Sequence, residues 1–127
     1  MWGWTRWVLV AIGVAILVYA ARYAWVDHQK RVVWREREAV VASEFAEMQQ
    51  AFPMGTRRNM VVAGLRARYP QFAIGDSTPD VQVWLGKEPS FVWYCNFMEP
   101  FVEFTFQSDG AEAQLVKIER RTTGECL

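Results

Sequence analysis

Residues 7–26 read WVLVAIGVAILVYAARYAWV, a stretch of twenty residues that carries a single charge, Arg22. An α-helix rises about 1.5 Å per residue, so roughly 20 apolar residues cross the ~30 Å hydrocarbon core of a bilayer. Arg22 lies near one end of the stretch, where its long side chain can reach the lipid headgroups. The stretch therefore predicts a transmembrane helix, and residues 1–26 are expected to form a membrane anchor.

Aromatic residues flank the apolar stretch on both sides, where amphipathic rings settle at the two membrane–water interfaces. A cleaved secretory signal is the alternative, with Arg6 as its positive end and a cleavage site after Ala20. The apolar run is at the long end for such a signal, and it has no polar face for lying along a surface, so a spanning anchor is favoured. The anchor is expected to be defined by Trp7, Ile12, Leu17, Arg22 and Trp25.

The residues around the anchor leave its orientation open. Lys and Arg are more numerous after the stretch than before it, which by the positive-inside rule places the C-terminal part in the cytoplasm. The pair Cys95 and Cys126 suits an oxidising compartment instead, although two separate thiols fit the sequence as well. A bond between them would close a loop of about thirty residues and stabilise the domain by roughly 3–4 kcal/mol in the chain-entropy model. We expect this disulfide to form.

Residues 27–52 contain no Gly or Pro and are predicted to continue the anchor as an amphipathic stalk helix, which Pro53 ends. The apolar stripe along this segment is too short for a confident coiled coil, and Glu38 occupies one of its positions. We therefore expect the far half of the stalk to pack on its own domain rather than on a partner. The stripe consists of Trp34, Val41, Phe45, Met48 and Phe52.

The remaining residues, 53–127, are predicted to form one small α+β domain. Its first element is a short amphipathic helix over residues 57–69, closed by Pro70. The run Ser77-Thr78-Pro79-Asp80 has the composition of a helix start, so residues 81–85 are interpreted as a second short helix. A strand is the alternative, because apolar and other residues alternate there.

The end of the chain has the alternation of antiparallel β-strands. Three strands are predicted, over residues 91–98, 101–107 and 113–121, with turns at Glu99-Pro100 and at residues 108–110. One face of each strand is apolar and suits a cover of helices. The expected fold is thus α+β, with one or two short helices on a three-stranded antiparallel sheet, or a four-stranded one if residues 81–85 are a strand.

The charge balance excludes one class of partner. Fourteen basic and fourteen acidic residues give no net charge, and the part beyond Glu38 is slightly acidic. Nucleic-acid binding relies on a basic patch, and the sequence has no basic stripe. We expect no nucleic-acid partner.

The sequence also lacks a catalytic constellation. Its one histidine, His28, lies beside the membrane in the stalk, and one His with two distant Cys residues does not match a zinc site. No nucleophile-elbow, phosphate-loop or dinucleotide motif occurs. We expect no enzymatic activity, no metal or other cofactor, and no small-molecule substrate.

Large side chains are more numerous in the domain than a small sheet needs for its core. The predicted strand over residues 91–98 carries them on both faces, so one face either lies under the stalk or is an exposed recognition patch. The candidates for binding a partner are Trp84, Trp93, Tyr94, Met98 and Phe101.

The second half of the chain contains several short motifs: Asp80-Val81, Leu85-Gly86-Lys87 with Pro89, Trp93-Tyr94, Val102-Glu103-Phe104 and Asp109-Gly110. Together they resemble the motifs of the BamE/SmpA-like domains, small α+β modules of the bacterial cell envelope whose architecture is related to that of β-lactamase inhibitor proteins. The resemblance covers about residues 52–121. Gly86 and Pro89 are separated by two residues where the family has one, and the lipobox cysteine of its lipoproteins is lacking.

The resemblance implies a non-enzymatic envelope module, and it favours the periplasm for the C-terminal domain. We therefore expect a single-pass protein of the inner (cytoplasmic) membrane, whose partners are the lipid bilayer and a membrane protein complex. Its expected role is that of an accessory or scaffold subunit. The alternative is a membrane-anchored inhibitor or immunity protein against an envelope-active toxin or enzyme, and a neighbouring toxin gene would favour it.

Overall fold

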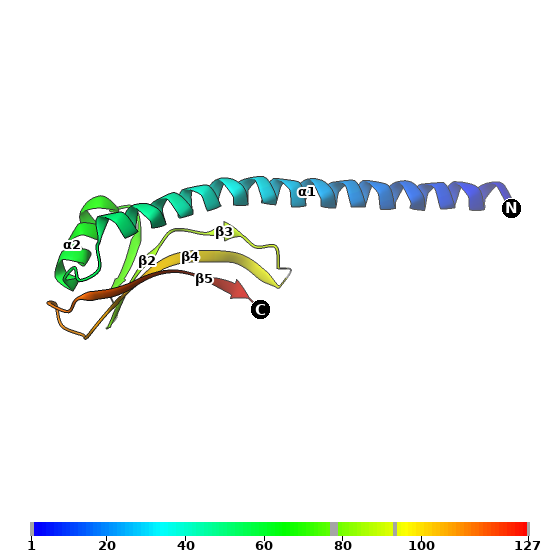
Figure 1. Cartoon of the computed structure of the whole chain (residues 1–127). Helices are drawn as coiled ribbons and strands as arrows, with labels where there is room; N and C mark the ends of the chain where they lie inside the picture. Colours follow the sequence, from blue (N-terminus) through cyan, green and yellow to red (C-terminus); the bar gives the residue numbers. More distant parts are fainter. Residues whose placement is uncertain (1, 77–78, 93, 127) are drawn as a thin grey trace.

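The computed structural model describes residues 2–76, 79–92 and 94–126, and it has an α+β fold (Figure 1). A long helix projects far beyond a small domain, in which a short helix and the C-terminal half of the long helix lie on one side of an antiparallel sheet (Figure 1). In chain order the elements are α1 (Trp2–Ala51), α2 (Arg58–Arg68), β1 (Ala73–Asp76), β2 (Asp80–Trp84), β3 (Glu88–Pro89), β4 (Cys95–Phe106) and β5 (Leu115–Cys126).

Helix α1 runs without interruption through both the predicted anchor and the predicted stalk. Residues 3–26 are exposed throughout, and the most apolar 18-residue window of the helix has a mean hydropathy of 1.9. By length and composition α1 can therefore cross a membrane. The helix ends at Ala51 because Pro53 lacks the N–H that a further turn would need.

The second half of α1 belongs to the domain. Val41, Met48 and Phe52 are buried, with 1%, 0% and 5% of their surface exposed, and Phe45 packs beside them. They share the core with residues of α2 and of the sheet, and the Phe52 ring meets the Phe104 ring edge-on at 5.8 Å between centroids. The stalk thus packs on its own domain, as its apolar stripe predicted.

The sheet is built around β4. Strand β5 pairs along almost the whole of β4, so β2 and β3 lie one after the other along the opposite edge, with β1 outside β2. The register places Val83 opposite Val102, and Phe104 opposite Ile118. Alternate residues of β2 and β4 therefore point towards the helices, which fills the core with Val81, Val83, Val102, Phe104 and Phe106.

The predicted helix over residues 81–85 is wrong, because residues 80–84 form β2. Val81 and Val83 are fully buried and alternate with half-buried Gln82 and Trp84, which is the period of a strand. Pairing with β1 on one side and with β4 on the other provides hydrogen-bond partners for the backbone N–H and C=O groups of β2. Ser77 and Thr78, part of the expected helix start, lie outside the described residues.

The predicted turn at Glu99-Pro100 is also wrong, because β4 continues through it. The carbonyl of Pro100 accepts a hydrogen bond of 3.0 Å from the Leu85 N–H, in the gap between the end of β2 and the start of β3. The edge of Pro100 that lacks an N–H therefore faces a break in the neighbouring strand, where little pairing is lost.

The other differences concern strand number and length. The sheet has five strands, because the two strands predicted over residues 91–98 and 101–107 are one strand, β4, and because β1, β2 and β3 join β4 and β5. Residues 91–92 and 94 belong to a loop, so the strand predicted from Phe91 begins at Cys95. Strand β5 continues past Arg121 to Cys126.

Candidate docking surface on the open face of the sheet

On one face of the sheet, no helix lies in the part of the chain that the structure describes. In β4 the residues between the core positions point away from α1 and α2, and their partners in β2 and β5 share that orientation. We call this side the open face. Its central residues are Gln82, Trp84, Phe101, Glu103, Lys117, Glu119 and Arg121.

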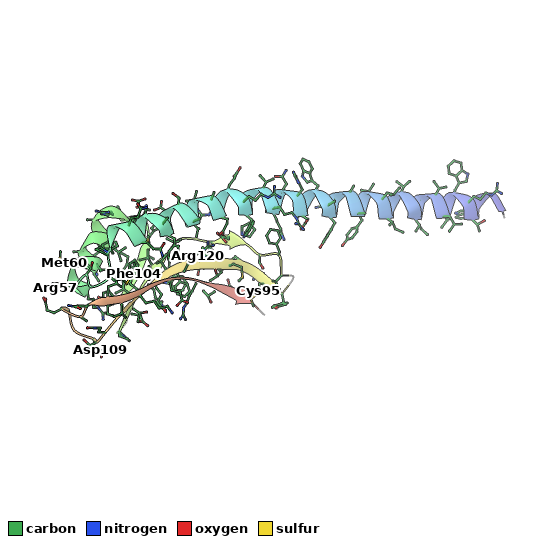
Figure 2. The ribbon with its side chains drawn as sticks, viewed as in Figure 1. Arg57, Met60, Cys95, Phe104, Asp109 and Arg120 are labelled. Atoms are coloured by element: carbon green, nitrogen blue, oxygen red, sulfur yellow. A yellow bond between two sulfur atoms is a disulfide. The ribbon has the colours of Figure 1, made fainter. Side chains whose placement is uncertain are left out.

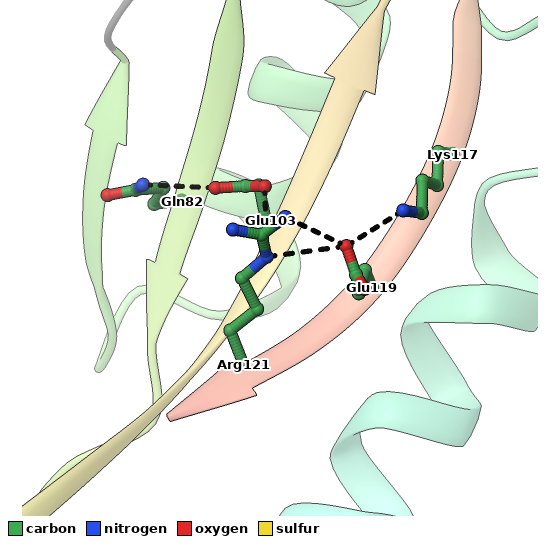
Figure 3. Close-up of polar contacts among 5 residues, drawn as sticks. All are labelled: Gln82, Glu103, Lys117, Glu119 and Arg121. Atoms are coloured by element: carbon green, nitrogen blue, oxygen red, sulfur yellow. Dashed lines mark hydrogen bonds and ion pairs between the residues drawn. The ribbon is translucent and has the colours of Figure 1, made fainter. Parts of the chain in front are cut away.

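A chain of polar contacts crosses the open face from β2 over β4 to β5 (Figure 3). The Gln82 side-chain amide donates to Glu103 at 3.3 Å, and Arg121 Nε lies 3.3 Å from the other oxygen of that carboxylate. Arg121 also donates to Glu119 at 3.2 Å, and Lys117 Nζ lies 3.0 Å from the same Glu119 oxygen. The charges therefore alternate in sign along β5.

Glu103 is the fixed centre of this chain. Its residue is only 8% exposed although no helix covers it, because it lies between Gln82 and the longer Arg121 side chain. Hydrogen bonds from Lys117 and then Arg121 hold the pKa of Glu119 below its ordinary value. The hydrogen bond to Glu119 and the charges of both glutamates raise the pKa of Arg121. Glu119 and Arg121 thus stay charged around neutral pH.

Aromatic side chains continue the open face beyond the polar chain. The rings of Trp84 and Phe101 lie 4.6 Å apart at 36° between planes, from directly paired positions of β2 and β4. Further along β4, Lys87 Nζ lies 3.9 Å from the centre of the Phe97 ring. The face therefore carries the half-buried rings of Trp84 and Phe97 and the buried ring of Phe101 beside the polar chain. Aromatic residues and Arg are enriched at protein–protein interfaces, whereas Lys and Glu are depleted there.

Of the four residues predicted to bind a partner that the structure describes, it brings two together. Trp84 and Phe101 are in contact on the open face. Met98 points to the opposite side, since it pairs with Glu88 and Gly124 and lines a hollow under α1. Tyr94 lies in the loop before β4 with 46% of its surface exposed, and Trp93 lies outside the described residues.

The polar chain was not predicted from the sequence, although the charge pattern of β5 indicates part of it. Lys117, Glu119 and Arg121 are spaced by two residues and alternate in charge, which on a strand places them on one face. The sequence around Glu103 does not identify the partners of its side chain. Its role becomes visible only when β2 and β5 are placed on either side of β4.

A second polar cluster fixes α1 to the other side of the sheet. Arg120 of β5 donates two hydrogen bonds to Glu38 of α1, at 2.5 and 2.6 Å, and Arg37 donates to the Leu85 carbonyl at 2.7 Å. The hydrogen bond from Arg120 lowers the pKa of Glu38. Burial, and then the charge of Glu38, raises the pKa of Glu88. The cluster locks the stalk in a fixed orientation on the sheet.

The hollows of the domain offer no comparable site for chemistry. A hollow of about 470 Å³ lies beside α2 and is lined by Arg58 and Asp76, which form an ion pair with each other. Across residues 2–76, 79–92 and 94–126, no group of three or more His, Cys, Asp or Glu side chains is placed to hold a metal ion. The open face is therefore the strongest candidate for a functional surface.

Comparison with known proteins assigns no family to this arrangement. No protein-family model, no curated protein and no solved structure matches the chain. Function is therefore inferred below from the surfaces of the chain itself.

Proposed function

We propose that this chain is a single-pass protein of the inner membrane whose small domain docks a protein partner on the open face, as an accessory or scaffold subunit of an envelope complex. The observation that carries the proposal is the continuity of α1. One helix joins an exposed, apolar segment of membrane-spanning length to the buried core of the domain. The open face is thereby held at a fixed distance from the bilayer.

Two sets of contacts hold the stalk in place where it meets the domain. Val41 and Met48 anchor α1 in the core, and the Glu38–Arg120 pair fixes its rotation on the sheet. A flexible linker would let the domain change its position relative to the apolar segment, whereas a continuous helix keeps the domain in one orientation relative to that segment. Such an arrangement suits a subunit that meets its partner in the same membrane.

The disulfide supports a periplasmic position for the domain. Cys95 and Cys126 face each other at the ends of β4 and β5, with 4.0 Å between their Cα atoms, and are bonded. Disulfides form and persist in oxidising compartments and are rare in the cytoplasm. The motif resemblance to BamE/SmpA-like envelope domains points the same way.

The test is the size and attachment of the native particle. We expect the protein to resist carbonate washing of membranes, because a spanning helix is not removed by high pH. After mild detergent extraction, blue-native electrophoresis should show it well above its own mass of 14.7 kDa. Release by carbonate would contradict the anchor, and a uniform monomer in several mild detergents would contradict the docking role.

A further inference from the structure

The loop between β3 and β4 lies at the end of the sheet nearest to the N-terminal half of α1 (Figure 1). Figure 2 marks this end with Cys95, whereas Met60 of α2 lies at the opposite end. Three described side chains of the loop region are large and exposed: Phe91 at 48%, Val92 at 39% and Tyr94 at 46%. The domain thus presents an apolar tip along the direction in which α1 leaves it.

The tip lies beside α1 at a defined height. A hollow of about 360 Å³ separates the loop from α1, and it is lined by Tyr23 and Val26 from the helix and by Val92 from the loop. Further from the N-terminus, the Phe91 ring meets the Trp34 ring edge-on at 6.1 Å between centroids. Along the axis of α1, the loop therefore extends from the level of residue 23 to the level of residue 34.

This height coincides with the predicted edge of the bilayer. The apolar stretch ends at Val26, so a helix that spans the membrane leaves the hydrocarbon core near this residue. Polar headgroups occupy roughly the next 5–8 Å on each side, which corresponds to about four or five residues of helix. Val92 shares a hollow with Val26 and hence lies at headgroup level.

The charges at this height suit an anionic lipid surface. Lys30, Arg31 and Arg35 follow the apolar stretch, and Arg31 lies 5.8 Å from the centre of the Phe91 ring while pairing with Asp27 at 2.8 Å. Exposed apolar groups beside basic ones are the composition of a membrane-interface contact. A bilayer surface is therefore the occupant that this tip fits.

The base of the loop is held in place. Cys95, the first residue of β4, is bonded to Cys126 at the end of β5, and Ser90 accepts a hydrogen bond of 3.1 Å from the Val92 N–H. The tip thus directly precedes the β4–β5 hairpin, whose end the disulfide closes.

We propose that residues 91, 92 and 94 of the β3–β4 loop lie in the headgroup layer of the same bilayer that α1 crosses, so that the domain touches the membrane at a second point. This inference rests on the proposed membrane anchor. A helix alone leaves the domain free to rotate about the helix axis, whereas a second contact fixes that rotation. The open face would then point in one direction relative to the membrane plane.

The experiment uses fluorescence from single labelled cysteines in the full chain. Because Cys95 and Cys126 are bonded, an introduced cysteine can be labelled with a nitrobenzoxadiazole dye without reductant. Val92→Cys reports on the tip, Phe91→Cys repeats the measurement at the neighbouring residue, Met60→Cys on the far end and Leu17→Cys on the anchor. Each protein is reconstituted into vesicles of phosphatidylcholine and phosphatidylglycerol, with nitroxide quenchers on the headgroups or deep in the acyl chains.

We expect headgroup nitroxides to quench the dye at Val92→Cys and at Phe91→Cys several-fold more strongly than at Met60→Cys, and acyl-chain nitroxides to quench the dye at Leu17→Cys. If Leu17→Cys is quenched while both loop positions match Met60→Cys, the second contact is overturned and the anchor stands. If Leu17→Cys is not quenched by acyl-chain nitroxides, the anchor itself is wrong and this inference falls with it.

Discussion

Glu38 shows how a single residue can mislead sequence analysis. It occupies a position in the apolar stripe of α1, so in the sequence it counts as an interruption of that stripe. In the structure it receives two hydrogen bonds from Arg120, a residue 82 positions later. Helical periodicity identifies the buried side of α1 correctly, but a partner so distant in sequence depends on how β5 is placed.

Replacing Glu38 by Gln should destabilise the domain by about 1–2 kcal/mol, because the charged hydrogen bonds from Arg120 are lost in a half-buried pair. Denaturant unfolding of the full chain in detergent measures this. Glu36→Gln is the matched control, since Glu36 is an exposed carboxylate on the same helix. Equal effects of the two substitutions would contradict a structural role for the pair.

The same substitution should show a defined pH dependence. The pKa of Glu38 is lower in the folded chain than its ordinary 4.5, so the ionised form stabilises the fold fully above that value. This contribution is lost as the pH falls through the lowered pKa. The difference in unfolding free energy between wild type and Glu38→Gln should therefore shrink on acidification, and a difference that grows would contradict the pair.

Gly64 allows α2 to approach the end of α1 closely. A Cβ at this position would lie 2.7 Å from Cε1 of Phe52, whose ring is buried against Phe104. Alanine favours a helix by about 1 kcal/mol, but overpacking a core costs about 1–3 kcal/mol, so Gly64→Ala should destabilise by about 1 kcal/mol. Thermal unfolding checks this, with Gly110→Ala as a control in open space. A stabilised Gly64→Ala protein would show that the contact is loose.

At the scale of elements, residues 77–86 carried two conflicting signals. A hydroxyl, a proline and an acid suggest a helix start, whereas Val81 and Val83 alternate with Gln82 and Trp84 as in a strand. The strand forms because β1 and β4 provide partners on both edges. The residues of this segment alone do not decide between helix and strand, because the deciding hydrogen bonds come from β1 and β4.

Strand β4 shows the same limit of local rules. A proline within a run of strand residues normally indicates a turn or an edge. Pro100 is tolerated because the neighbouring strand is broken between Trp84 and Glu88. The reversal predicted at residues 108–110 lies within the loop that joins Phe106 to Leu115. There the Ala113 N–H donates to the Gly110 carbonyl, and N–H groups of Arg58 and Asn59 donate to carbonyls of the same loop.

The β4–β5 hairpin is closed at its open end by the disulfide, so removing the bond should destabilise the domain. Cys126→Ser should cost about 3–4 kcal/mol in the chain-entropy model, since the bonded residues are 31 positions apart. Denaturant unfolding of the wild type with and without reductant should show the same loss, and Cys126→Ser should be insensitive to reductant. No change on reduction would mean that pairing of β4 with β5 alone holds the hairpin.

At the scale of the whole molecule, the sequence predicted the α+β fold class and an N-terminal helix long and apolar enough to cross a membrane. Both depend on patterns within continuous stretches, which survive without knowledge of tertiary contacts. The open face was predicted only through Trp84 and Phe101. Its polar chain joins three strands, so its members become neighbours only once the sheet is assembled.

Docking on the open face is the central claim, and site-specific photo-crosslinking in native membranes tests it most directly. Thr123 is exposed on β5, two residues beyond Arg121 on the same face, and Met60 is exposed on α2 at the far end of the domain. A photoreactive residue at position 123 should yield a discrete adduct with a membrane protein, whereas one at position 60 should not. No adduct from position 123, or equal adducts from both positions, would contradict docking on this face.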